Sequence, residues 1–290
     1  MSYHLIIGDY AHSSWSLRGW LLFERFGIAR DLTVISFRNQ DVAEQLAEYV
    51  PAKTVPTLVT PEGVAIGESL AMAEELATRH PEAGLWPKDP KARAIARALA
   101  SEMHAGFGAL RDFCPMALRV AYENVPVPDE VKADLSRLEL VWRHAREATG
   151  ASGPWLCGAY SIADVFFAPV ATRVATYGLE VSDEAQAYVD AHLNDPAFRR
   201  WRALGLVHGA ELPWYARDYD QVEWPGPKPL AAKVVAEGPS ANEACPYSGK
   251  PVNYFMEMDG KVYGFCNALC RDKTVADPEA WPKFRELAGI

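Results

Sequence analysis

The sequence predicts an α/β domain, then an all-helical domain, then a small unit that carries most of the cysteines. Three observations predict this order. In residues 1–82, short β-prone runs alternate with helical patterns. From Asp89-Pro90 to about residue 210, every strong hydrophobic pattern has helical spacing. From Trp224 the chain becomes rich in proline, and three cysteines follow within residues 245–270.

The first domain is expected to alternate strands and helices. Gly27 ends a helical pattern of large apolar residues, and Pro61-Glu62-Gly63 between two β-prone runs indicates a hairpin. Ser69 is predicted to cap the last helix of the domain, which runs to His80-Pro81. The predicted strands lie at residues 3–8, 33–37, 57–60 and 64–66, and the predicted helices at 15–26, 40–48 and 69–80. This βαβ and then ββα order is that of a thioredoxin-like domain.

The second domain is predicted to be entirely helical. Asp89-Pro90 is a helix start, and one apolar stripe is formed by Leu135, Leu138, Val141, Trp142 and Ala145. Residues 161–164 (SIAD) form a capping box ahead of a strongly apolar helix, which contains Pro169 in its interior. We interpret this capping box as folding information rather than chemistry.

Composition narrows the class of protein. The chain has 290 residues, a net charge of −9 and a pI near 5.3, which argues against nucleic acid as the main partner. It contains no run of 18 apolar residues, so we expect no membrane span. Five cysteines in a chain of this length do not make a disulfide scaffold, so we expect a reduced, cytoplasmic protein.

Residues 13–18 (SSWSLR) open the first helical pattern and offer hydroxyls beside helix-start amides. A thiol with a pKa near 8.5 is mostly protonated at neutral pH, whereas the thiolate is the nucleophile. A hydroxyl that donates to the sulfur stabilises the thiolate, and the helix start adds favourable partial charge. Ser13, Ser14 and Ser16 are therefore candidates to activate a thiol. The alternative is that Ser13 and Ser14 only cap the helix.

Two further pieces follow in a fixed order. Val55-Pro56 stands between a loop and a strand, where a proline is often cis and leaves the backbone of the preceding residue open to an extended peptide. Glu68-Ser69 stands at a helix start, so Ser69 can bind a carboxylate and Glu68 can accept from an ammonium. The alternatives are an ordinary strand-start proline and a solvated glutamate beside a cap.

Together the three pieces resemble the glutathione site of the glutathione transferases, over about the first three quarters of the chain. The first piece is similar to the motif of the serine-using, zeta-like group. The resemblance implies glutathione as co-substrate, a hydrophobic electrophile as second substrate, and a homodimer. It assigns the stabilisation of the glutathione thiolate to Ser13, with Ser14 as the next candidate. The implied glutathione-binding residues are Ser13, Ser14, Trp15, Ser16, Arg18, Val55, Glu68 and Ser69.

One residue departs from that group. Trp15 stands where its isomerase members have a cysteine, and an indole would narrow the site for the electrophile. We therefore expect a transferase rather than a maleylacetoacetate isomerase. The neighbouring His12 is interpreted as a loop histidine.

The last fifty residues hold Cys245, Cys266 and Cys270. Their context resembles the small, treble-clef-like TRASH and YHS modules, associated with metal sensing and trafficking. Cys266 and Cys270 would share one helix face, and three thiolates suit Zn²⁺ or Cu⁺. A fourth ligand could be a carboxylate such as Asp277, a water, an exogenous thiol such as glutathione, or a second chain. The alternatives are a metal-free module packed around its cysteines, or a redox pair of Cys266 and Cys270.

The expected architecture thus has four parts: residues 1–82, a thioredoxin-like glutathione-binding domain; residues 88–215, an all-helical domain; residues 216–240, a proline-rich linker; and residues 241–290, the cysteine module. The isolated Cys114 and Cys157 are expected to be buried as small apolar residues. The leading hypothesis is a glutathione-dependent transferase acting on a small electrophile. The alternative is a metal-binding or metal-responsive adaptor on a transferase-fold dimer.

Overall fold

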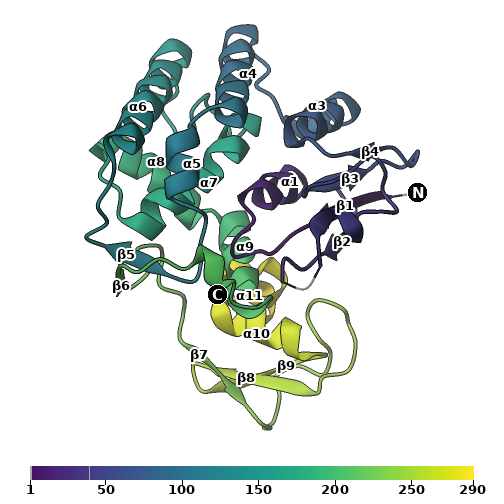
Figure 1. Ribbon diagram of the computed structural model, residues 1–290. Coiled ribbons are helices and arrows are strands. Elements are labelled where there is room, and N and C mark those ends of the chain that lie inside the picture. The colour runs from purple at the N-terminus through teal and green to yellow at the C-terminus, as the bar shows by residue number, and fades with distance from the viewer. Residues whose placement is uncertain (1, 39) are drawn as a thin grey trace.

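The computed structural model describes residues 2–38 and 40–290. Its first part is a four-stranded sheet with the order β2-β1-β3-β4, in which β1 pairs in parallel with β2 and antiparallel with β3. The sheet and its helices lie on the right in Figure 1. The bounds are β1 Tyr3–Ile7, α1 Ser14–Glu24, β2 Arg30–Val34, α2 Val42–Gln45, β3 Thr57–Val59, β4 Ala65–Ile66 and α3 Ser69–Arg79.

The predicted elements of this part are all present, but β2 begins three residues before its predicted start at Thr33 and ends three residues before its predicted end at Phe37. The helix predicted over 40–48 is shorter, Val42–Gln45. β2 is an edge strand whose three central side chains are exposed, so its polar first residues do not weaken the pairing with β1. Hydrophobicity therefore could not mark where this strand starts. Gly27 adopts φ +66°, as the end of a helix requires.

The second part is helical, with one short strand. Its bounds are α4 Pro90–Ala105, α5 Gly108–Phe113, β5 Ala121–Glu123, α6 Asp129–Thr149, α7 Ile162–Tyr177, α8 Asp183–Asn194 and α9 Pro196–Val207. Asp89 caps α4 by accepting from the Ala92 N–H at 2.8 Å, as predicted. No helix within residues 2–38 and 40–290 is both long and apolar enough to cross a membrane.

Helix α7 is the centre of this part, because it is buried along its whole length and packs on α1, α4 and α8. The predicted capping box is present: the Asp164 carboxylate accepts from the Ser161 N–H at 2.9 Å. It also accepts from the Leu156 N–H at 3.1 Å and the Tyr188 hydroxyl at 3.0 Å. Burial raises the pKa of Asp164 to about 6 in spite of these bonds. Pro169 lies inside the helix, as predicted.

The predicted linker, residues 216–240, is not a plain connector. Strand β6 (Asp220–Val222) pairs with β5 of the helical part, and β7 (Ala232–Val235) pairs with β8 (Tyr254–Met258) of the cysteine-bearing unit. Both strands lie among prolines and have mostly exposed side chains, so composition did not predict them. The remaining bounds are β9 Lys261–Phe265, α10 Ala268–Ala276, α11 Pro282–Ala288 and the short 3₁₀ turns η1 Pro81–Ala83, η2 Pro213–Tyr215 and η3 Pro278–Ala280.

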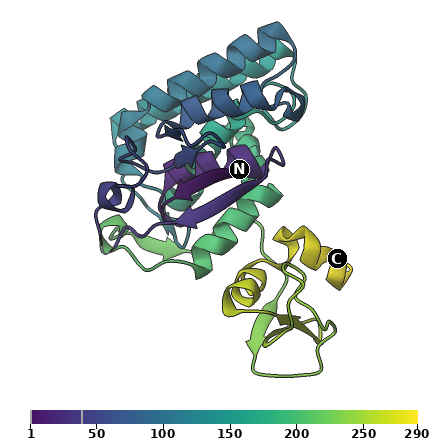
Figure 2. The ribbon, with the colours of Figure 1, turned by 90° about the vertical axis from the view of Figure 1, so that its right-hand side faces the viewer.

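The C-terminal unit has its own small core, and it packs on α9. Met256, Phe265 and Phe284 are fully buried in a cluster that also includes Ala203 of α9. Figure 2 shows this unit, in yellow, beside the lower end of the rest of the molecule. Since α9 contributes to this cluster, the unit packs directly against the helical part and is not held by its connecting segment alone.

Two arginines of α9 fix this docking. Arg199 donates to both carboxylate oxygens of Asp277 at 2.7 Å and to Glu279 at 3.1 Å. Arg200 joins Glu24 at the end of α1 (2.9 Å) to the carbonyl of Ala280 (3.1 Å). Bidentate, half-buried pairs of this kind hold an orientation more firmly than exposed ion pairs do.

We predict that His192 makes the fold sensitive to acid. Its ring is buried beside Trp155 and Tyr188, and burial, followed by the charge of Arg25, lowers its pKa from 6.5 to about 3. Below pH 6.5 the unfolded chain binds a proton that the folded protein does not, so stability is lost as the pH falls toward 3. His192→Phe should flatten this dependence, by up to about 1.4 kcal/mol per pH unit.

Urea unfolding at several pH values between neutrality and pH 4.5 or so would measure this slope. The exposed His144 offers a control, since His144→Gln should keep the slope of the unaltered protein. Equal slopes for His192→Phe and the unaltered protein would contradict the prediction.

Candidate functional site

The start of α1 is held by a network of buried serines. Ser13 is the N-cap: its Oγ accepts from the Ser16 N–H at 3.3 Å and donates to the Ser16 Oγ at 2.8 Å. The Ser16 Oγ in turn accepts from the N–H of Gly8, at the end of β1, at 2.9 Å. Ser13 and Ser16 therefore join the first strand to the first helix.

Ser14 has a different surrounding. Its Oγ accepts from the Nη2 of Arg173, on α7, at 3.3 Å. Arg173 is 4% exposed and also donates to the carbonyls of Cys114 (2.9 Å) and Pro169 (3.0 Å). A guanidinium from the helical part thus contacts the first turn of α1.

Two more arginines join Arg173 in a cationic cluster, defined here as Arg18, Arg111 and Arg173. Within the described residues, none of the three pairs with a carboxylate. Arg18 is 2% exposed, and its Nε and Nη1 are buried without a partner. Burial, then the charges of Arg173 and Arg111, lower the pKa of Arg18, and burial followed by Arg111 lowers that of Arg173 to about 10. A bound anion would relieve this electrostatic cost.

Trp15 lies against this cluster. The Cζ of Arg18 is 4.4 Å from the centroid of the indole ring and that of Arg111 is 4.7 Å away. The His104 ring meets the indole edge-on at 5.4 Å. The indole therefore holds the cations by cation–π contact, a role that the cysteine of the related isomerase motif could not fill.

Val55 and Pro56 have the backbone that the sequence indicates. The Val55–Pro56 bond is cis, and Pro56 packs so close to α1 that a Cβ on Gly19 would lie 2.7 Å from the Pro56 Cβ. Among the described residues, none bonds to the N–H or the C=O of Val55. Both groups are therefore available to an extended peptide.

The prediction that Ser69 caps α3 is wrong. Ser69 is the first helical residue, Glu68 is the N-cap, and no side chain caps this end. Helix α3 starts one residue earlier than predicted, so the N-cap position falls on Glu68 and not on Ser69. The consequence is that the Ser69 Oγ is buried without a hydrogen-bond partner at a helix start.

Glu68 is exposed, with a carboxylate oxygen 3.5 Å from the Nε2 of His104. Sequence reasoning did not include His104, Arg111 or Arg173. Only Arg173 left a signal, as a lone charge in the apolar interior of α7. His12, interpreted as a loop residue, is buried with its Nδ1 2.8 Å from an Asp9 carboxylate oxygen.

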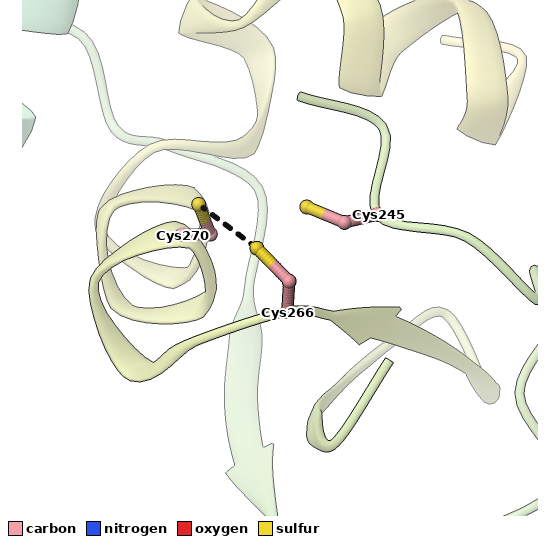
Figure 3. A group of neighbouring side chains, drawn as sticks. All are labelled: Cys245, Cys266 and Cys270. Atoms are coloured by element: carbon pink, nitrogen blue, oxygen red, sulfur yellow. Dashed lines mark hydrogen bonds between the residues drawn. The ribbon is translucent and has the colours of Figure 1, made fainter. Parts of the chain in front are cut away.

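The second candidate site joins three cysteines of the C-terminal unit (Figure 3). Cys245 lies in the loop before β8, Cys266 follows β9, and Cys270 lies in the first turn of α10. Their sulfur atoms all lie within 4.8 Å of one another, and those of Cys266 and Cys270 are 4.0 Å apart. The predicted cysteines therefore come together as one cluster.

Polar groups around this cluster favour the charged form of one cysteine. Burial alone would raise the pKa of Cys245, but the N–H groups of Cys266, Tyr247 and Ser248 and the Ser248 hydroxyl lower it to about 7. The Ser248 hydroxyl also donates to the Cys266 sulfur at 3.2 Å. Burial, then the charge of Cys245, raise the pKa of Cys270 to about 12.

Asp277, expected as a possible fourth ligand, does not join the cluster. Its carboxylate is engaged by Arg199, and among the described His, Cys, Asp and Glu side chains only the three cysteines meet here. The unit is linked through Arg200 of α9 to Glu24, which lies at the opposite end of the 11-residue α1 from Ser13, about 16 Å along the helix. This geometry gives no support to a glutathione molecule shared by the two sites.

The isolated cysteines behave as predicted. Cys114 and Cys157 are buried, and burial raises the pKa of each thiol to about 12. Neither is disulfide-bonded.

Comparison with known proteins identifies the fold. The chain superposes on a Burkholderia glutathione transferase homologue with bound glutathione at a TM-score of 0.52 and 20% identity, covering 69% of this chain and 96% of that one. Residues 12–79 match the sequence model of the glutathione S-transferase N-terminal domain. The fold is thus that of the glutathione transferases, with a thioredoxin-like domain followed by a helical domain, and the comparisons support that family.

Two relatives found by sequence are named as one particular enzyme, maleylacetoacetate isomerase. A probable maleylacetoacetate isomerase of Caenorhabditis elegans is 33% identical over 107 residues, which is 37% of this chain and 50% of that protein. The maleylacetoacetate isomerase of Rattus norvegicus is 28% identical over 181 residues, or 61% and 81%. The first match thus spans only half of the relative's length. These names leave the expectation of a transferase rather than an isomerase without support.

Proposed function

We propose that this protein is a glutathione-dependent enzyme that adds the glutathione thiolate to a small electrophile. The observation that carries the proposal is a set of polar groups, at the three predicted positions, that have no hydrogen-bond partner among the described residues. They are the buried donors of Arg18, the backbone of Val55 and the hydroxyl of Ser69. Buried polar groups are normally hydrogen-bonded, so the lack of a partner at these positions supports a ligand there.

Each part of glutathione has a counterpart in this set. Val55 would pair with the cysteinyl backbone through its N–H and C=O. Ser69, at the start of α3, would donate to the γ-glutamyl carboxylate, and the exposed Glu68 would accept from its ammonium. A serine hydroxyl at the start of α1 would stabilise the thiolate, and holding both reactants would supply proximity.

The cationic cluster supports an anionic electrophile rather than the purely hydrophobic one expected from the sequence. Maleylacetoacetate, which the names of the relatives contain, carries two carboxylates, one of which is conjugated with a carbon–carbon double bond. Thiolate addition to such a bond, rotation and loss of the thiolate isomerise it; addition alone, with protonation of the carbon, transfers the thiol. Both reactions begin with the same activated sulfur. We propose that the substrate is an anionic electrophile with a conjugated double bond. We also propose that the protein is a homodimer in the reduced cytoplasm.

Ser69→Ala should weaken glutathione binding by about 10- to 100-fold, because it removes a hydrogen bond to a charged group. A calorimetric titration with reduced glutathione would measure the change. Ser136→Ala, on the exposed face of α6, is the matched control and should bind as the unaltered protein does. If the unaltered protein binds no glutathione, the proposed function is wrong.

Arg111→Gln should lower kcat/KM for an anionic electrophile such as chloroacetate by about tenfold or more, since it removes a charge-assisted contact. The same change should have a smaller effect on the neutral chlorodinitrobenzene. Arg97→Gln, at an exposed pair with Glu74, serves as the control. An equal loss for both electrophiles would contradict the anionic substrate class.

A second candidate function rests on the cysteine cluster. We propose that Cys245, Cys266 and Cys270 bind a soft metal ion, Zn²⁺ or Cu⁺, and that the unit is a metal-responsive module on the transferase fold. The support is the approach of three free thiols to within 4.8 Å. A metal bound there would supply a Lewis-acidic centre held entirely by thiolates.

Anaerobically purified protein should contain about one metal ion per chain by elemental analysis, and Cys266→Ser should lose it. Cys157→Ala, at a buried thiol outside the cluster, should retain it. Protein without bound metal, even after dialysis against Zn²⁺ and against Cu⁺, would contradict this second function.

A further inference from the structure

We propose that Ser14, held by Arg173, is the hydroxyl that donates to the glutathione sulfur, whereas Ser13 is a structural helix cap. The inference rests on the proposed glutathione-dependent function. It reverses the order of candidates that the family resemblance implies, and it assigns a positioning role to a residue of the helical part.

The hydroxyl of Ser13 is already engaged on both sides. Its proton is directed to the Ser16 Oγ at 2.8 Å, and its oxygen accepts from the Ser16 N–H. The Ser16 Oγ is also bonded to Gly8, and Ser13 and Ser16 are both buried. To donate to a sulfur, Ser13 would have to give up its hydrogen bond to the Ser16 Oγ.

The hydroxyl of Ser14 is engaged on one side only. Its oxygen accepts from Arg173 at 3.3 Å, and its proton meets no acceptor among the described residues. A donor on the oxygen polarises the O–H group and strengthens the hydrogen bond that the hydroxyl can itself donate. Ser14 is also less buried than Ser13, which leaves it accessible to a ligand.

Arg173 is fixed for this role. Its Nε and Nη1 are bound by the carbonyls of Cys114 and Pro169, so that only Nη2 is directed to Ser14. Arg18 and Arg111 add positive charge near Arg173, while the acidic Glu68 lies at His104. The guanidinium therefore orients the hydroxyl and also contributes charge that favours a thiolate.

The proton balance is simple. The thiol proton of glutathione passes to water, and the sulfur keeps the electron pair as a thiolate. Ser14 donates a hydrogen bond without losing its proton, and Arg173 remains charged throughout. No oxidant, reductant or further reactant is required.

The test is the pKa of the enzyme-bound glutathione thiol, read from the ultraviolet absorption of the thiolate as the pH is varied. Ser14→Ala and Arg173→Gln should each raise this pKa by about one unit, which is a tenfold loss of thiolate at a pH below the pKa of the unaltered complex, and glutathione affinity measured at that same low pH should change little. Arg173→Lys should recover part of the shift, since it keeps the charge but not the fork of donors.

Ser13→Ala is the matched control. It should leave the thiol pKa unchanged and lower the melting temperature by roughly 2–4 °C, because it removes a helix cap. A raised thiol pKa in Ser13→Ala with no change in Ser14→Ala would overturn the assignment while leaving the proposed function intact. Absence of glutathione binding by the unaltered protein would overturn both.

Discussion

The uncompensated positive charge where α1, α5 and α7 meet is the constraint on which the site depends. Burial, then the charges of Arg173 and Arg111, lower the pKa of Arg18, and no described carboxylate balances the three cations. A bound anion or a developing negative charge would offset this cost. A thiolate and a carboxylate-bearing electrophile are both anions, so the same cluster can serve binding and activation.

The rest of the fold holds this cluster in place. Helix α7 is buried from end to end, so Arg173 projects from a rigid element toward the first turn of α1. The serine network and the close packing of Pro56 on Gly19 fix α1 against the sheet. On the opposite side, α9 carries the cysteine unit through Arg199 and Arg200. The two candidate sites are therefore parts of one packed structure, and Arg200 links the cysteine unit to the end of α1 that lies opposite Ser13.

Local signals made much of this predictable. Caps, glycine stops and hydrophobic spacing predicted the order of the main elements, and the spacing of three cysteines predicted that they meet. The partners of the serines were not predictable, because Arg111 and Arg173 lie about 100 and 160 residues away and are recruited only by tertiary packing. The prediction that Ser69 is the N-cap of α3 was wrong by one residue, which is the usual uncertainty of helix ends.

The most direct test of the account is a crystal structure of the protein with bound glutathione. We expect the sulfur within hydrogen-bond distance of the Ser14 hydroxyl, the cysteinyl backbone paired with Val55, and the γ-glutamyl carboxylate on Ser69. We also expect Ser13 to keep its bonds to Ser16. A sulfur bonded to Ser13, or a peptide bound away from Val55 and Ser69, would contradict the account.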